Sequence, residues 1–116
     1  PQMQVINYLR SGPITHNQIS CVSIHAVGST GVDFSYKTST EETTDRLTFY
    51  IDDTATGASR SGVIPLTPET YTTVRGNHTY KWCYGKDSSV DTGDDAVWLE
   101  NTMVHWTVSL LNQMEF

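Results

Sequence analysis

Acidic side chains are concentrated in one polar loop near the end of the sequence. Asp87, Asp91, Asp94 and Asp95 place four carboxylates within nine residues. Hard cations such as calcium take about six to eight oxygen ligands, often from flexible loops of this kind. The loop lacks the glutamate that an EF-hand carries at its twelfth position, so a solvated acidic loop is the alternative. We predict a calcium site at these four aspartates.

Other residues that could bind a metal ion are more scattered. Asp52 and Asp53 could form a second acidic cluster with Glu41, Glu42 and Asp45. The four histidines lack the His-x-His spacing of cupin metal sites, and single strand histidines are usually surface residues. Two of them occupy polar strand faces and could lie side by side across a ladder. These two are His25 and His105, and the other two histidines are His16 and His78.

Tyrosine and tryptophan side chains could form a binding surface. Tyr80, Trp82 and Tyr84 share one strand face, which is either core or a binding platform, and Trp106 alternates with valines and is predicted to be core. By contrast, Trp98 alternates away from its apolar neighbours, and Tyr50 does the same on its own strand. We predict Trp98 and Tyr50 as exposed anchors, and we group them with Asp52 and Asp53 as candidate ligand or interface residues.

No local pattern indicates catalysis. A Gly-x-Ser-x-Gly elbow, which would mark a serine nucleophile, does not occur in the sequence. A chain of 116 residues also has little material left to build a substrate cleft once two sheets are formed. The sequence therefore predicts a binding or assembly domain and not an enzyme.

Composition narrows the class of protein further. Seventeen threonines accompany valine and aromatic residues, which favour strands. The formal charge is −6, and the seven Lys and Arg residues do not cluster, so nucleic-acid binding is not expected. No apolar stretch approaches the roughly 18 residues that a membrane-spanning helix needs, so membrane insertion is not expected either.

Alternation of apolar and polar residues predicts about eight short strands in one domain over residues 1–116. The longest alternating run covers residues 104–114, where Val104, Trp106, Val108 and Leu110 share a face. Residues 28–31, Gly-Ser-Thr-Gly, read as a tight hairpin turn. Pro65 lies inside a short strand and predicts a sheet edge, because proline cannot donate to a ladder.

This pattern predicts an all-β fold, an antiparallel β-sandwich that is jelly-roll-like and has about eight strands. An immunoglobulin-like sandwich is the weaker alternative. It would place a tryptophan between its two cysteines on the strand that follows the first, whereas Trp82 lies directly beside Cys83. Cys21 and Cys83 could form a disulfide, but two separate buried thiols are the favoured interpretation.

The strand pattern over all 116 residues, together with the ending VHWTVSLL at residues 104–111, resembles the protruding spike domain of small non-enveloped RNA virus capsid proteins of the nodavirus and tombusvirus kind. The resemblance implies self-association as a homodimer or higher homo-oligomer, attachment to a host receptor, and a location on the virion surface.

The alternative function is a secreted lectin or carbohydrate-binding module in an extracellular setting. In that function, aromatic side chains, aspartates and a calcium ion would hold the hydroxyl groups of a glycan. An attached hydrolase domain would favour this alternative, whereas an upstream shell-like domain would favour the capsid.

Overall fold

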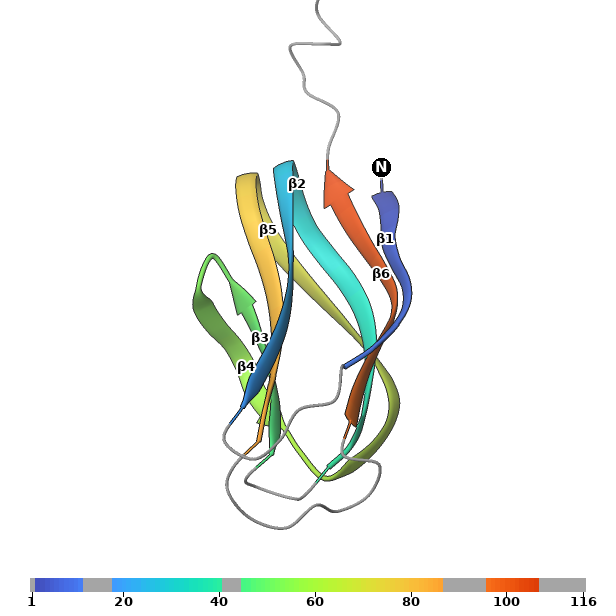
Figure 1. Ribbon diagram of the computed structural model, residues 1–116. Coiled ribbons are helices and arrows are strands. Elements are labelled where there is room, and N and C mark those ends of the chain that lie inside the picture. Colours follow the sequence, from blue (N-terminus) through green and yellow to red (C-terminus); the bar gives the residue numbers. More distant parts are fainter. Residues whose placement is uncertain (1, 12–17, 41–44, 87–95, 107–116) are drawn as a thin grey trace, which may run out of the picture.

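The computed structural model describes residues 2–11, 18–40, 45–86 and 96–106, which fold into antiparallel strands (Figure 1). The strands are β1 (Gln2–Arg10), β2 (Ile19–Ser39), β3 (Arg46–Ile51), β4 (Thr54–Arg60), β5 (Val63–Gly85) and β6 (Ala96–Trp106). Their order in the sheet is β1-β6-β2-β5-β3-β4. No helix in the described ranges is long and apolar enough to cross a membrane.

Strands β2 and β5 are long enough to contribute to two layers. Residues 19–26 of β2 pair with residues 78–85 of β5, whereas residues 31–39 of β2 pair with residues 63–72 of β5. Figure 1 shows both strands bending at the same end of the molecule. The sheet is thereby folded over on itself. The first layer consists of β4, β3, the second half of β5 and the first half of β2. The second layer consists of the first half of β5, the second half of β2, β6 and β1.

When the halves of β2 and β5 are counted separately, the sandwich has eight strand segments. In chain order, the first layer runs 5-4-7-2 and the second runs 6-3-8-1. This is the strand order of a jelly roll, in which one long antiparallel hairpin is folded double. The predicted all-β, jelly-roll-like sandwich of about eight strands is therefore confirmed.

The predicted hairpin at residues 28–31 is wrong, because β2 continues through this region and only bends. The pairing register of β2 shifts on both sides of Ser29, as expected for bulges, which bend a strand. The buried Ser29 hydroxyl lies 2.9 Å from the carbonyl oxygen of His105 and 2.7 Å from the hydroxyl of Tyr80. These hydrogen bonds fix the bend of β2 to both neighbouring strands.

Aromatic side chains join the two layers. Phe34 of the second layer lies 4.8 Å from Phe49 and 5.3 Å from Trp82, ring centre to ring centre, and both partners belong to the first layer. The shared face of Tyr80, Trp82 and Tyr84 is fully buried and is therefore core, not a binding platform. Trp106 is half-buried, so the prediction that it belongs to the core is wrong.

The edge strands of the sandwich agree with the sequence at Pro65 and differ from it at β4. The first half of β5 is an edge of the second layer and Pro65 is exposed there, as predicted. Strand β4 is not indicated by the sequence, because Asp-Asp-Thr-Ala-Thr-Gly at residues 52–57 resembles one continuous turn. The turn consists of Asp52 and Asp53 alone, and β4 starts directly after them.

Cys21 and Cys83 form a disulfide, so the interpretation as two separate thiols is wrong. The two residues are direct partners in the register of β2 and β5, with their Cα atoms 4.1 Å apart. Both alternate away from the inward-facing Val22 and Trp82, so they meet on the outer face of the first layer. A disulfide is typical of proteins in oxidising compartments, including the cell exterior.

Candidate functional site

Three of the four predicted ligand or interface residues lie together at the β3–β4 turn. Asp52 and Asp53 form the turn with positive φ angles of 52° and 66°, as a two-residue hairpin turn requires. The Lys81 ammonium lies 3.1 Å from Asp53 Oδ1 and 4.9 Å from the ring centre of Tyr50. Lys81 therefore links Tyr50 and Asp53 and covers part of the face that Tyr50 would present to a ligand.

Asp52 binds the neighbouring strand through His78. Its carboxylate lies 2.7 Å from His78 Nδ1 and accepts a hydrogen bond from the backbone amide of Thr79 at 2.8 Å. The other ring nitrogen, His78 Nε2, lies 2.6 Å from the carbonyl oxygen of Val74. Both partners of the ring only accept hydrogen bonds, so both nitrogens donate and His78 is an imidazolium.

The pKa of His78 is raised above its ordinary value, first by the hydrogen bond to Asp52 and then by the one to Val74. The hydrogen bond from His78 is also the main reason that the pKa of Asp52 is lowered. The stabilisation that His78 provides is therefore complete below its unfolded pKa of about 6.5 and is lost as the pH rises through the raised folded value. The contribution of Asp52 is present above its unfolded pKa of about 3.9 and is lost as the pH falls through the lowered folded value.

We expect the wild-type domain to be more stable to urea at pH 6 than at pH 8.5, because His78 loses its proton over this range. Asp52→Asn should reduce this pH difference, since the amide does not favour the imidazolium. Asp53→Asn is the matched control, because Asp53 contacts Lys81 and not His78. Equal pH dependence in the wild type and Asp52→Asn would contradict the ion pair.

Trp98 is not the exposed anchor that was predicted. Its side chain points away from Val97 and Leu99 as expected, yet it is only 8% exposed. The reason is that Lys37 and Arg10 cover the ring, with the Lys37 ammonium at 4.4 Å and the Arg10 guanidinium carbon at 5.4 Å from the ring centre. Alternation predicted the direction of the side chain, but it does not show which long side chains lie over it.

The predicted calcium ligands Asp87, Asp91, Asp94 and Asp95 lie outside the described residues. Within the described ranges, no three His, Cys, Asp or Glu side chains come together to hold a metal ion. Asp45 and Asp52 flank the two ends of β3, which separates them by about 23 Å of extended chain, so they do not share a site.

The side-by-side placement of His25 and His105, which the sequence left open, does not occur. His25 is opposite Thr79, whereas His105 is opposite Gly31 and lies 2.6 Å from the Asp33 carboxylate.

A polar cluster that the sequence patterns did not indicate lies between β4 and the first half of β5. Arg60 donates through Nη2 to Glu69 Oε1 and, at 2.9 Å, to the hydroxyl of Tyr71. Arg60 Nε donates to Glu69 Oε2 at 3.3 Å, and the Tyr71 hydroxyl donates to Glu69 Oε1 at 2.7 Å. We call Arg60, Glu69 and Tyr71 the Arg60 cluster.

The Arg60 cluster borders a hollow of about 350 Å³ on one open side of the sandwich, between the edges of the two layers. Gly57 lines this hollow, and a Cβ atom there would lie 2.9 Å from the Tyr71 hydroxyl. The Arg60 guanidinium lies over the ring of Tyr36, 5.2 Å from its centre. Although the Arg60 side chain is 94% buried, Nη1 has no hydrogen-bond partner in the described part of the chain.

The charges in the cluster are firmly held. Burial lowers the pKa of Arg60, but the hydrogen bond and charge of Glu69 outweigh this effect and raise it overall, so the guanidinium stays charged. Burial, followed by the hydrogen bond to Glu69, raises the pKa of Tyr71, so the phenol stays neutral. The cluster therefore presents a charged guanidinium and a neutral phenol as fixed hydrogen-bonding groups.

One feature of the sequence points to part of this cluster. Glu69 and Tyr71 are two residues apart on a strand and so share a face. Arg60 is the last residue of β4, a strand that the sequence did not indicate. β5 is continuous, but in the sequence its bend resembles the end of one strand and the start of another. The approach of Arg60 to Glu69 therefore depends on the tertiary fold alone.

The comparisons with known proteins identify a similar fold but no family. No protein-family model matches the chain, and no curated protein matches it. Among solved structures, the fold is similar to part of the secreted serine protease VesC from Vibrio cholerae, with a TM-score of 0.75 and 18% sequence identity. The match covers 90% of this chain and 23% of that protein, so this chain spans about a quarter of the length of VesC.

Proposed function

We propose that this domain is a secreted, non-catalytic recognition module that binds a neutral sugar at the Arg60 cluster. The observation that carries the proposal is the hydrogen-bonded group of Arg60, Glu69 and Tyr71, which lines a hollow and leaves the buried Arg60 Nη1 without a partner among the described residues. A buried donor without a partner costs about 1–3 kcal/mol or more.

The chemistry of the cluster fits a polyhydroxylated ligand. A sugar hydroxyl both donates and accepts, so it can bind the Glu69 carboxylate and the Arg60 guanidinium together. The ligand is neutral because Glu69 already balances the charge of Arg60 and would repel a second carboxylate. Gly57 leaves space beside the Tyr71 hydroxyl, which is where a ligand would approach.

The molecular setting agrees with this proposal. The Cys21–Cys83 disulfide suits an extracellular protein. A similar fold also occurs as about a quarter of a secreted hydrolase, and an attached hydrolase is the context in which a carbohydrate-binding module was expected. The jelly roll serves lectins and viral capsid proteins alike, so the spike function, with its self-association and host receptor, stays a prediction.

We expect a glycan array to identify a neutral ligand, and calorimetry to show that Tyr71→Phe weakens its binding about tenfold or more. The substitution removes a hydroxyl that is bonded to two charged groups. It keeps the ring in place against Phe34 and Phe49. Tyr8→Phe is the matched control, because Tyr8 is 59% exposed on β1, outside the cluster.

Unchanged binding in Tyr71→Phe would overturn this site, and an array without any neutral glycan ligand would overturn the function.

A further inference from the structure

The sandwich has a second open side, formed by β1 and the first half of β2. β1 ends the strand order of the second layer, and residues 19–26 of β2 form the edge of the first layer. A cavity of about 250 Å³ lies between these two edges. The Arg60 cluster lies elsewhere, between β4 and the first half of β5. Binding in this cavity is therefore independent of the proposed sugar site.

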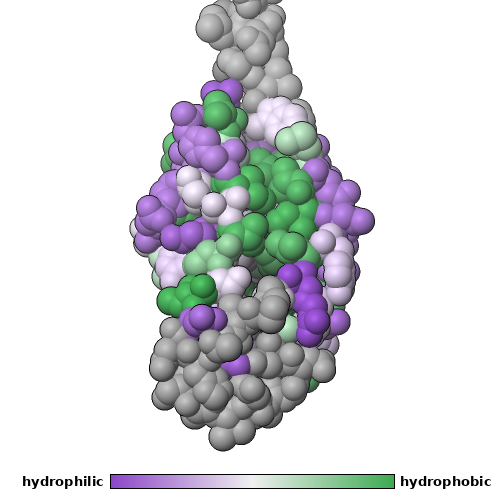
Figure 2. Space-filling view, viewed as in Figure 1, coloured by the Kyte–Doolittle hydropathy of each residue, from purple (hydrophilic) through white to green (hydrophobic). Residues whose placement is uncertain are grey.

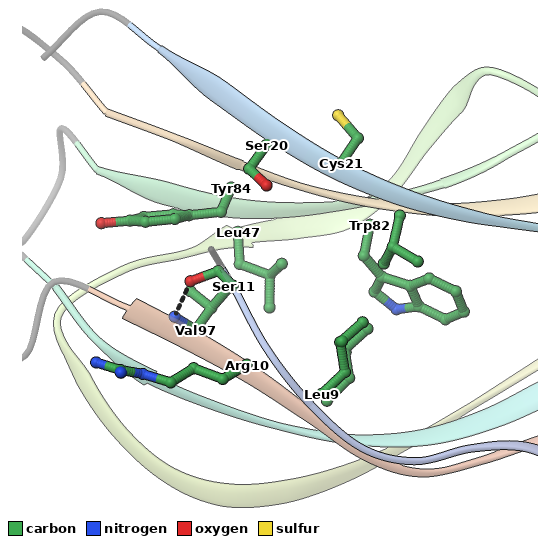
Figure 3. A pocket seen from close by; sticks show the side chains of 11 residues that line it. Leu9, Arg10, Ser11, Ser20, Cys21, Leu47, Trp82, Tyr84 and Val97 are labelled. Atoms are coloured by element: carbon green, nitrogen blue, oxygen red, sulfur yellow. Dashed lines mark hydrogen bonds between the residues drawn. The ribbon is translucent and has the colours of Figure 1, made fainter. Parts of the chain in front are cut away.

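The lining of this cavity is mostly apolar. Figure 2 shows an apolar patch on this face of the molecule, between polar margins. Figure 3 shows side chains from both layers around the cavity, with Leu9 of β1 facing Trp82 of β5. The Ser11 hydroxyl at the cavity accepts a hydrogen bond from the Val97 amide at 3.1 Å, so it already has a partner. Arg10 is the charged residue in the lining, and its guanidinium lies over Trp98.

Trp82 lines this cavity and carries a buried hydrogen-bond donor. Its side chain is 98% buried, and its Nε1 has no partner among the residues that the structure describes. In Figure 3 the indole nitrogen lies on the side of the ring that faces Leu9. A buried indole N–H normally has an acceptor. The lining therefore combines mostly apolar walls with a buried neutral donor, and it also contains the hydroxyl-bearing Ser11, Ser20 and Tyr84.

We propose that the cavity binds a compact, neutral, single-ring aromatic molecule whose carbonyl oxygen accepts the hydrogen bond of Trp82 Nε1. Size supports one ring, since an apolar cavity of about 150 Å³ holds benzene and pockets for larger ligands begin at about 300 Å³. The Trp82 donor is neutral and the Arg10 guanidinium lies over Trp98, so the lining favours a carbonyl over a carboxylate. Leu9, which lines the cavity from β1, is 38% exposed, so the cavity is open to solvent at this edge.

The proposal is tested by adding acetophenone or ethylbenzene to ¹⁵N-labelled protein and following the three indole N–H signals by NMR. Trp98→Phe and Trp106→Phe assign those signals without altering Trp82. We expect the Trp82 signal to move with acetophenone, and acetophenone to bind about 2- to 10-fold more tightly than ethylbenzene, which lacks the oxygen.

A variant that fills the cavity provides the control. Val22→Phe places a ring at the partly buried rim and should abolish the shift, whereas Ser23→Phe, on the opposite face of the same strand, should not. Equal affinity for the two compounds would overturn the role of the Trp82 donor. No movement of the Trp82 signal with either compound would overturn the site and would leave water as the partner of Trp82.

Discussion

Replacing Gly31 by alanine is expected to destabilise the domain by about 3–5 kcal/mol or to prevent it from folding. A Cβ atom at this position would lie 2.3 Å from the carbonyl oxygen of Tyr71 and 3.2 Å from the Cα atom of Thr72. Both atoms belong to the backbone of β5, so the clash cannot be relieved by a change of rotamer. Gly31 is buried directly after the bend of β2, where the two long strands pass from one layer to the other.

Gly76→Ala is the matched control for this prediction. Gly76 lies on the other bent strand, opposite Ser29, and a Cβ atom there would meet its nearest neighbour at 3.6 Å, an ordinary contact. We expect a change in unfolding free energy of about 1 kcal/mol or less. Urea unfolding of the two variants provides the comparison, and equal stability would contradict the close approach of β2 and β5.

Removing the disulfide is the second change with a large expected effect. The two bonded cysteines are 62 residues apart in the sequence. On the chain-entropy model, closing a loop of this length stabilises the folded state by about 4 kcal/mol. We expect the Cys21→Ser, Cys83→Ser double variant to unfold about 15 °C below the wild type. The double substitution avoids leaving a single reactive thiol on the outer face of the sheet.

A reductant serves as the control for the disulfide. Dithiothreitol should lower the Tm of the wild type toward that of the double variant and leave the variant itself unchanged, which circular dichroism can follow. A wild-type Tm that does not respond to complete reduction of the bond would contradict its structural role.

The fold class could be predicted because alternation depends only on neighbouring residues. Val32, Phe34 and Tyr36 alternate with polar residues, and all three belong to the core. The continuity of β2 and β5 could not be predicted in this way, because a glycine such as Gly28, whose φ is positive, is found both in hairpin turns and in bulges. The choice between turn and bulge is made by distant partners such as Tyr80, which binds Ser29.

The candidate site was less accessible from the sequence. Tyr50, Asp52 and Asp53 are neighbours along the chain, so their proximity is local, but their partner Lys81 comes from another strand. The exposure of Trp98 depended on the positions of Lys37 and Arg10, which no local pattern specifies. The Arg60 cluster combines residues of β4 and β5, two strands whose full lengths the local pattern does not show. The disulfide could not be predicted because it depends on the register of β2 against β5.

The most direct test of the proposed function is an NMR titration of the ¹⁵N-labelled domain with the neutral glycan identified on the array. We predict that the side-chain signals of Arg60 shift on binding, together with backbone signals at the end of β4 and in the first half of β5. Saturable shifts at another surface, with the Arg60 signals unmoved, would contradict sugar recognition by the Arg60 cluster.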